Sequence, residues 1–355
     1  MFWSRKKKSF PALVGLDIGS SSVKAVQLKQ SGGRYELVNL AVDQLSQDSI
    51  VDGAIMDTLS VSSAIERVFD QNKIATPNVA TSVSGHSVIV KRITVKATTE
   101  EELERAVQQE ALQHIRFDLS EVNLSYHVLG PAANGDELDV FLLAVKNEKI
   151  QSHTDVLAQA NKTPLVMDID AFAMQNAFEN SYEPPADQII ALLNIGASIM
   201  NINITRAGMP MFTRDVSVGG NQYTDILQKE LDLSFEDAEK LKMGHTLPGV
   251  APDAALPYLR SVSELLLLEI QKTFDFFRHT TSTDPINAIY LAGGTARVQG
   301  LTDLLKAEFN VPVEILNPFR KMHFSPEKFD PEFVAEHAPR MTVAVGLALR
   351  SFDTA

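Results

Sequence analysis

The chain has 355 residues, with 45% hydrophobic and 22% charged side chains, a composition typical of globular proteins and a length sufficient for two or more cores. Its formal charge of 32 − 45 = −13 argues against nucleic acid as a partner, because such binding depends on cationic contacts to phosphates. The sequence has no cysteine for disulfide or thiol chemistry, and no apolar run approaches the ~20 residues that span a bilayer. We therefore expect a protein that does not cross the membrane.

The first eight residues are basic and include two aromatic side chains. Phe2 and Trp3 precede four basic residues at positions 5–8, but Pro11 and Asp17 interrupt the apolar stretch that a signal peptide needs. Two interpretations stay open. The segment is either a frayed tail or a contact to an anionic membrane surface, where each basic residue contributes ~1 kcal/mol.

A strand, a tight turn and a returning strand are predicted near the start of the chain. The apolar residues 12–16 form the first strand, which ends at Asp17, Gly19 and the serines at 20–22, and the second strand covers residues 23–28. Such a turn offers backbone N–H groups and hydroxyls to a phosphate chain, and a carboxylate at the strand end suits Mg²⁺. A serine-rich hairpin without a ligand is the alternative.

The elements that follow complete the first part of the chain. A strand over residues 35–42 makes an antiparallel meander with the first two strands. A helix over residues 55–69 comes next, and then a strand over residues 79–83. The predicted inner positions of the helix are Leu59, Ile65, Val68 and Phe69.

Residues 86–162 predict a compact inserted unit with the order β-α-β-β-α. Its strands cover residues 88–95, 123–129 and 139–145, and its second helix covers residues 147–159. The first helix begins behind Thr98 or Thr99, where Glu101 or Glu102 completes a capping box. One apolar face of that helix consists of Leu103, Val107, Ala111 and Ile115.

The strand-turn-strand pattern occurs a second time, roughly 175 residues later. A strand over residues 164–167, a helix over 171–178 and a proline-containing linker at 182–185 lead to it. An apolar strand over residues 189–195 then ends around Asn194, Gly196 and Ser198, and strands over 199–204 and 209–218 follow. The repeat favours two related lobes, each with a phosphate-binding hairpin, over two unrelated hairpins.

The remainder of the chain predicts helices around two more strands. The helices cover residues 222–231, a segment capped by Ser234 that runs through Asp237 and ends at Gly244, a long stretch that follows a loop over 248–257 and ends near Thr280, and residues 301–309. Leu266, Ile270, Phe274 and Phe277 form the inner face of the long helix. A strand over 286–291 runs into the glycine turn at 292–297, which allows close approach of a base or phosphate, and a strand covers 311–316. Residues 317–339 predict irregular structure, and a helix over 342–350 carries Ala344, Gly346 and Ala348 for close packing.

Five of these segments, in this order, resemble the signatures of the actin-like ATPase superfamily, which includes actin, sugar kinases and heat-shock chaperones. They are residues 15–24 and 194–198 for the phosphates, 168–178 and 342–350 for two connecting helices, and 291–297 for adenosine. The resemblance implies an α/β fold of two ribonuclease H-like duplicated lobes with an inserted β-α-β-β-α subdomain in the first. It divides the chain into a first lobe (1–85, 163–188 and 322–355), the insert (86–162), a second-lobe core (189–219 and 286–321) and a second-lobe helical subdomain (220–285).

Within that superfamily the chain resembles PilM, a family of type IV pilus assembly proteins in the FtsA-like branch. The resemblance rests on Gly-Leu-Asp-Ile-Gly-Ser-Ser-Ser-Val-Lys at 15–24, Asp-Ile-Asp-Ala-Phe-Ala at 168–173, Ala-Gly-Gly-Thr-Ala at 292–296 and the position of the insert. FtsA proteins end in a linker and a basic membrane-binding helix. This sequence ends five residues after Arg350, which favours PilM.

Membership in PilM implies a cytoplasmic protein, peripheral to the inner membrane, that serves pilus biogenesis and twitching motility. Its implied partner is the cytoplasmic N-terminal peptide of PilN, gripped between the first lobe and the insert. PilO and PilP join through the same complex, and the pilus motor ATPases communicate with it. A homodimer or filament is compatible with the resemblance, which leaves open the groove residues and the effect of nucleotide state on partner choice.

The resemblance also implies a site for ATP or ADP with Mg²⁺, held at Asp17. The implied nucleotide-binding residues are Asp17, Gly19, Ser20, Ser21, Ser22, Lys24, Asn194, Gly196, Ala197, Ser198, Gly219, Gly220, Glu239, Lys242, Gly293, Gly294 and Arg297. For Glu239 and Lys242 the alternative is an exposed i,i+3 helix pair. No catalytic residue is assigned, and Asp170 and Gln175 are either water-positioning groups or cap and core residues.

Asn194 departs from the superfamily pattern, in which an aspartate begins the second phosphate hairpin. An amide does not supply the charge that helps to hold a metal or orient the attacking water, so we expect ATP binding with weak or no hydrolysis. Two other functions remain as alternatives. An FtsA-like cell-division protein would form filaments, and a sugar-kinase-like phosphotransferase would need a catalytic aspartate in a polar sugar cleft.

Overall fold

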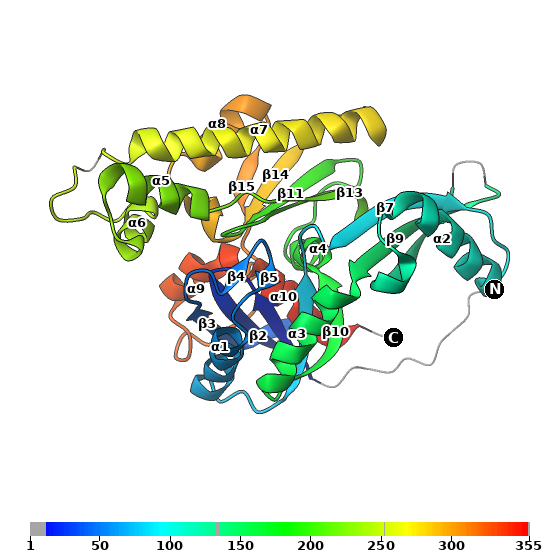
Figure 1. Cartoon of the computed structure of the whole chain (residues 1–355), viewed down its shortest axis with the longest axis horizontal. Helices are drawn as coiled ribbons and strands as arrows, with labels where there is room; N and C mark the ends of the chain where they lie inside the picture. The colour runs from blue at the N-terminus through cyan, green and yellow to red at the C-terminus, as the bar shows by residue number, and fades with distance from the viewer. Residues whose placement is uncertain (1–11, 133–134, 252, 354–355) are drawn as a thin grey trace.

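The computed structural model describes residues 12–132, 135–251 and 253–353 (Figure 1). The basic N-terminal segment, for which a frayed tail and a membrane contact were the two interpretations, lies outside these residues. Among the described helices, none combines the length and the apolar character that a membrane span requires. Two five-stranded sheets and one three-stranded sheet organise the fold.

The first sheet has the strand order β10-β6-β1-β2-β3. Its strands are β1 (Val14–Ile18), β2 (Ser22–Ser31), β3 (Arg34–Gln44), β6 (Asn78–Val83) and β10 (Thr163–Ile169). The first three are antiparallel, as predicted, and β6 and β10 extend the sheet in parallel. Helices α1 (Thr58–Gln71) and α3 (Asn147–Gln159) contact each other, and their apolar side chains share one core with β1 and β2.

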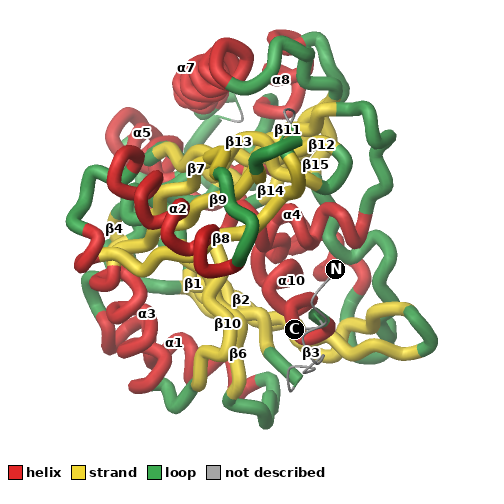
Figure 2. Tube along the Cα trace, turned by 90° about the vertical axis from the view of Figure 1, so that its right-hand side faces the viewer, coloured by secondary structure: helices red, strands yellow, loops and turns green. Residues whose placement is uncertain are grey.

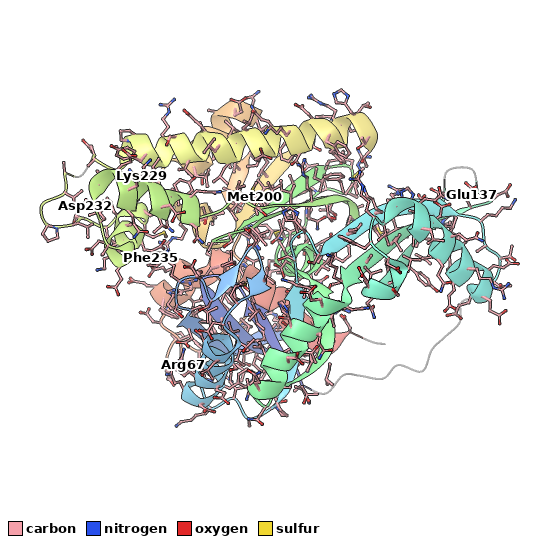
Figure 3. The ribbon with its side chains drawn as sticks, viewed as in Figure 1. Arg67, Glu137, Met200, Lys229, Asp232 and Phe235 are labelled. Carbon is pink, nitrogen blue, oxygen red and sulfur yellow. The ribbon has the colours of Figure 1, made fainter. Side chains whose placement is uncertain are left out.

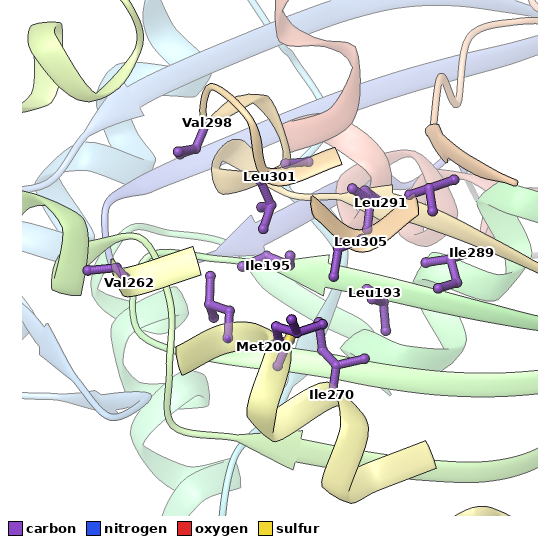
Figure 4. Packing of buried hydrophobic residues seen from close by; sticks show 14 of the residues in the cluster. Leu193, Ile195, Met200, Val262, Ile270, Ile289, Leu291, Val298, Leu301 and Leu305 are labelled. Carbon is purple, nitrogen blue, oxygen red and sulfur yellow. The ribbon is translucent and has the colours of Figure 1, made fainter. Parts of the chain in front are cut away.

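The second sheet repeats this topology, with the order β13-β12-β11-β14-β15. Its strands are β11 (Ile189–Ile195), β12 (Met200–Arg206), β13 (Met209–Val216), β14 (Ala288–Ala292) and β15 (Val313–Ile315). The long helix α7 (Leu256–Thr280) and α8 (Leu301–Phe309) cover one face, where Ile195, Met200 and Leu291 meet Ile270 and Leu305 (Figure 4). The predicted duplication of an α/β lobe is therefore confirmed.

The third sheet, β7-β9-β8, forms the inserted unit at one side of the molecule (Figure 1). Its elements are β7 (Val88–Val95), α2 (Glu100–His114), β8 (Val122–Pro131) and β9 (Leu138–Lys146). Thr99 caps α2 by accepting from the Glu102 N–H, as the predicted capping box requires. At the opposite end lie α5 (Asn221–Leu231) and α6 (Phe235–Lys242), so that Figure 3 separates Lys229, Asp232 and Phe235 widely from Glu137.

Helices α4 (Asp170–Ser181) and α10 (Thr342–Leu349) lie beside each other between the two large sheets (Figure 2). A Cβ at Gly346 would overlap the Ala173 carbonyl oxygen, and a Cβ at Gly15 would overlap the Ala344 carbonyl oxygen. The two glycines therefore let α10 approach both α4 and β1 at backbone distance, and the close packing predicted for its small residues is confirmed.

Several predictions about local structure were wrong. The helix predicted from residue 55 begins at Thr58 behind the cap Asp57, and residues 50–55 form the small hairpin β4 (Ile50–Val51) and β5 (Ala54–Ile55). Leu59, predicted as an inner position, lies in the first turn of α1 and is 73% exposed. The stretch predicted as irregular contains α9 (Pro331–His337), capped by Asp330. The loop predicted through residue 257 ends earlier, because Pro257 is accommodated in the first turn of α7. Tyr182, predicted in a linker, is buried against Phe178.

Candidate functional site

A cavity of about 980 Å³ lies where the two lobes face each other. The predicted nucleotide-binding residues that line it are Asp17, Gly19, Ser20, Ser21, Lys24, Asn194, Gly196, Ala197, Ser198, Gly219, Gly220, Glu239, Lys242, Gly293, Gly294 and Arg297. Ser22 is the exception, because its side chain is buried beneath the turn and accepts a hydrogen bond from Arg340. The fold thus brings residues from both repeated hairpins, from α6 and from the glycine turn to one cavity.

The first hairpin presents an ion pair at the end of β1. Asp17 and Lys24 are cross-strand partners in the register of β1 and β2, and the Lys24 Nζ lies 3.0 Å from the Asp17 Oδ2. Both residues are 9% exposed, so solvent screens the two charges only weakly and each charge depends on the other for neutralisation. Gly19 leaves room beside them, because a Cβ there would lie 2.9 Å from the Lys24 Nζ.

The second hairpin presents amides at the corresponding register. Asn194 and Asn201 are cross-strand partners on β11 and β12, and the Asn194 Nδ2 donates to the Asn201 Oδ1 at 2.8 Å. The Asn201 Nδ2 donates in turn to the Asp215 Oδ1 at 2.8 Å, and the backbone N–H of Gly85 donates to the other Asp215 oxygen at 2.6 Å. Burial raises the pKa of Asp215. This series of hydrogen bonds, which we call the amide ladder, connects Asn194 at the cavity to Gly85, just before the inserted unit.

Backbone groups close the second hairpin against its neighbours. A Cβ at Gly219 would lie 2.5 Å from the Ala197 carbonyl oxygen, and the Gly196 carbonyl accepts from the Gly220 N–H and the Thr295 hydroxyl at 2.9 Å each. Gly293 has φ +86°, a conformation that side chains rarely adopt. The turn around 196–198, the start of α5 and the glycine turn after β14 therefore meet directly.

Lys242 on α6 is buried rather than part of an exposed helix pair. Its Nζ forms an ion pair with Glu239, donates to the Thr224 Oγ1 at 2.9 Å and donates to the Gly220 carbonyl at 3.3 Å. The residue is 6% exposed, and this burial lowers the pKa of its ammonium group. The structure does not support the alternative of a merely exposed i,i+3 pair for Lys242.

Asp170, at the start of α4, is another carboxylate that lines the cavity. Burial, and next the negative charge of Asp17, raise the pKa of Asp170 to about 6, against hydrogen bonds from Ser82 and Ser84. Gln175, by contrast, does not line the cavity: it accepts from Asn203 at 2.8 Å and donates to the Gly208 carbonyl at 2.9 Å. It therefore connects α4 to β12 and is placed as a core residue.

Asp17 and Asp170 form a donor set that fits Mg²⁺ together with phosphate oxygens, since this ion takes one or two carboxylates and completes its shell with waters and phosphates. Within the described ranges, no group of three or more acidic or histidine side chains is arranged to hold a metal unaided. Carboxylates outnumber lysines and arginines along the cavity wall. Because the wall carries more negative than positive side chains, a ligand with several phosphates would be repelled less if a bound cation such as Mg²⁺ accompanied it.

Arg340 and Lys149 are among the cationic residues of the cavity that the sequence reasoning missed. Arg340 precedes α10, between the stretch predicted as irregular and the helix predicted over 342–350, and Lys149 reaches the cavity from α3 of the insert and donates to the Gly53 carbonyl. Burial lowers the pKa of Lys149, although Asp170 and Asp215 oppose that shift. Neither residue lies in a segment with a glycine-rich or serine-rich turn, so no local pattern indicated them.

The duplicated lobes, the central helix pair and the inter-lobe cavity define an actin-like ATPase fold. The family described as type IV pilus assembly protein PilM matches residues 15–352, and the chain therefore belongs to this family. A solved structure titled PilM-PilN type IV pilus biogenesis complex is 27% identical, with a TM-score of 0.86 over 97% of this chain and 99% of that one. The resemblance inferred from the sequence motifs is confirmed.

More distant proteins share the fold. MreB5 of Spiroplasma citri, solved bound to ADP, is 14% identical with a TM-score of 0.50 over 96% of this chain and 95% of that one. The ethanolamine utilization protein EutJ from Carboxydothermus hydrogenoformans is 16% identical with a TM-score of 0.57, over 98% of this chain and 93% of that one. The cell division protein FtsA of Helicobacter pylori is 21% identical over 95% of this chain and 81% of its own length.

Proposed function

We propose that this protein is an ATP-binding scaffold of type IV pilus assembly, and that it binds the cytoplasmic N-terminal peptide of PilN. The observation that carries the proposal is the convergence of both hairpins, α6 and the glycine turn on one inter-lobe cavity, in a chain of the PilM family. The similarity to the chain of a PilM–PilN complex supports PilN as the partner. The proposal extends to a peripheral position on the cytoplasmic side of the inner membrane, with PilO, PilP and the motor ATPases as further contacts.

In this proposal the two hairpins hold the phosphates and the glycine turn backs the adenine. Ser20 and Ser21 offer hydroxyls and backbone N–H groups from the first lobe, and Ala197 and Ser198 close from the second. Mg²⁺, when bound, supplies positive charge to the phosphates, and Asp17 and Asp170 would hold it. The structure of a fold relative with ADP supports a nucleotide as the ligand class.

We propose that hydrolysis is weak or absent. Asn194 stands where an ionised aspartate would orient water, and its Nδ2 is committed to Asn201. A steady-state assay of phosphate release should therefore give little turnover above background for the wild-type protein. Brisk turnover, sensitive to substitution of Asp170, would contradict this.

We propose that the chain divides into the four units given by the sequence boundaries, and that helix α3 connects two of them, the insert and the first lobe. Helix α3 belongs by sequence to the insert at 86–162, yet Val156, Leu157 and Ala160 pack in the core of the first sheet. A peptide held between the first lobe and the insert would therefore lie beside a helix that both units share. This contact offers a route by which cavity and peptide affect each other.

Calorimetry with a synthetic N-terminal peptide of PilN tests the proposal. We expect the peptide to bind, a scrambled peptide of equal composition not to bind, and Mg-ATP to bind in a separate titration. Absence of peptide binding would reject the scaffold role, whereas absence of ATP binding would reject the nucleotide role. Peptide affinity unchanged by Mg-ATP would make the nucleotide a structural cofactor rather than a switch.

A second candidate is an FtsA-like filament, which the similarity to the Helicobacter pylori protein favours. ATP-dependent sedimentation separates the two, because a scaffold that acts as a monomer or dimer stays in the supernatant. A pellet that forms only with ATP would support the filament.

A further inference from the structure

Arg340 occupies the cavity at the point where segments of both lobes meet. It lies just before α10, lines the cavity, and its Nη2 donates to the Ser22 hydroxyl at 3.1 Å. Its Nε is buried and has no hydrogen-bond partner among the described residues. The guanidinium is therefore fixed at one corner by the first hairpin and unsatisfied along another edge.

The carboxylates around Arg340 are already committed to other cations. Those that interact with it electrostatically are Asp17, Glu239 and Glu336. Asp17 pairs with Lys24 at 3.0 Å, Glu239 pairs with Lys242, and Glu336 lies 3.4 Å from the Arg297 Nη1. Within the described chain Arg340 takes part in no ion pair of its own. Each of these three acids is thus paired with another base, and Arg340 is left without an ion-pair partner.

A guanidinium in this state is suited to an anion. Burial lowers the pKa of Arg340, which reflects lost hydration, but an arginine stays charged in proteins and the cost of burial is left for a counter-charge to offset. The Arg340 side chain lines the cavity, and a planar guanidinium matches the geometry of phosphate oxygens; its Nε is itself buried, so the contact would be made through the terminal N–H groups. A neutral sugar or base can hydrogen-bond to a guanidinium or stack on it, but supplies no counter-charge.

We propose that Arg340 is the phosphate-recognition group of this cavity and that it makes the site selective for nucleoside diphosphates and triphosphates over nucleosides. The inference rests on the proposed nucleotide site and adds a residue that the superfamily motifs did not indicate. Ser22 then acts as the positioning residue for the guanidinium, since its buried hydroxyl accepts from Nη2. This accounts for a serine of the first hairpin that does not line the cavity.

The test compares ADP, ATP and adenosine, each with Mg²⁺, by calorimetry on the wild-type chain and on Arg340→Gln. We expect at least tenfold weaker binding of ADP and ATP by the variant and unchanged binding of adenosine. Arg340→Lys, which keeps the charge without the planar fork, should give an intermediate loss. Arg67→Gln, at an exposed ion pair with Asp43 in which neither residue lines the cavity, serves as the control for removing one positive charge and should change none of the three affinities.

A thermal shift assay separates phosphate recognition from a structural role. Removal of an uncompensated buried charge should leave the melting temperature of the ligand-free Arg340→Gln protein equal to or above that of the wild type, while the ADP-induced shift becomes smaller. Equal ADP affinity of wild type and variant would overturn the inference but leave the nucleotide site intact. A ligand-free variant that melts well below the wild type, with an unchanged ADP-induced shift, would make Arg340 structural. No binding of nucleotide by the wild type would instead reject the proposed function.

Discussion

The two hairpins that face each other across the cavity share a topology and differ in chemistry. At the corresponding cross-strand register, the first lobe pairs Asp17 with Lys24, and the second pairs Asn194 with Asn201. In the first lobe the charge stays at the end of the strand and is neutralised there. In the second lobe Asn194 donates to Asn201, and Asn201 donates to Asp215 on the next strand. The first hairpin therefore presents an ion pair to the site, and the second presents hydrogen-bonded amides.

The helices behind the hairpins differ in the same sense. Gly15 of β1 lets α10 approach the strand at backbone distance, whereas the same position in β11 is Leu192, which packs in an apolar cluster with Met174 and Phe178 of α4. The first hairpin is therefore supported by backbone contact and the second by side-chain packing.

The largest effect is expected from Gly15→Val. The new side chain would overlap the Ala344 carbonyl oxygen and the Ala348 backbone nitrogen, and helix and strand would have to separate. We expect a loss of about 4 kcal/mol or more in the free energy of unfolding, measured by urea titration. Gly294→Ala, where a Cβ meets nothing within 4 Å, is the matched control and should change stability by less than about 1 kcal/mol. Similar values for the two variants would show that the first hairpin is not supported by this backbone contact.

The next effect is expected from Asp17→Leu, which leaves the Lys24 ammonium buried without its counter-charge. We expect a destabilisation of about 3 kcal/mol in the ligand-free protein. The double variant Asp17→Leu/Lys24→Met should regain most of this loss, because it removes both charges together. A double variant no more stable than the single one would mean that the two charges are not coupled. That result would contradict the ion pair inferred from the 3.0 Å separation of Nζ and Oδ2.

A smaller effect is expected from Asn194→Asp, and it should be reversible by a second change. A carboxylate at 194 can only accept hydrogen bonds, and the Asn201 Nδ2 already donates to Asp215. A carboxylate oxygen of residue 194 would therefore face the Asn201 Oδ1, and neither atom can donate. We expect a cost of about 2 kcal/mol. Adding Asp215→Asn lets the ladder reverse direction and should restore stability, with a coupling energy visible in a double-mutant cycle. Additive losses would contradict the ladder. If the reversed ladder also raises phosphate release, Asn194 limits hydrolysis.

The smallest effect at neutral pH is expected from Asp170→Asn. The folded protein holds the Asp170 proton up to a pKa of about 6, above the ordinary 3.8, so this group makes stability fall as pH rises from about 4 to about 6. The asparagine removes that slope but also weakens the hydrogen bonds from the serines, and we expect a net gain of about 1 kcal/mol above pH 7. Urea titrations of both proteins from pH 4 to 8 measure the difference. An unchanged difference across this range would mean that Asp170 titrates normally.

Much of the fold was predictable because its signals are local. The two strand-turn-strand units, the cap of α2 at Thr99 and the small residues of α10 each follow from neighbours within a few positions. The glycines and serines of the site were predictable for the same reason, since a backbone that approaches a ligand needs those residue types wherever it lies.

The rest depended on which distant segments meet. Leu59 follows an apolar spacing but lies in the first turn of α1 on its outer side, and α3 follows the insert in sequence but completes the core of the first sheet. Arg340, Lys149 and Asp215 carry charges that are unremarkable along the chain. Only the tertiary structure buries them beside the two hairpins, and burial turns an ordinary surface charge into one that requires a partner or a ligand.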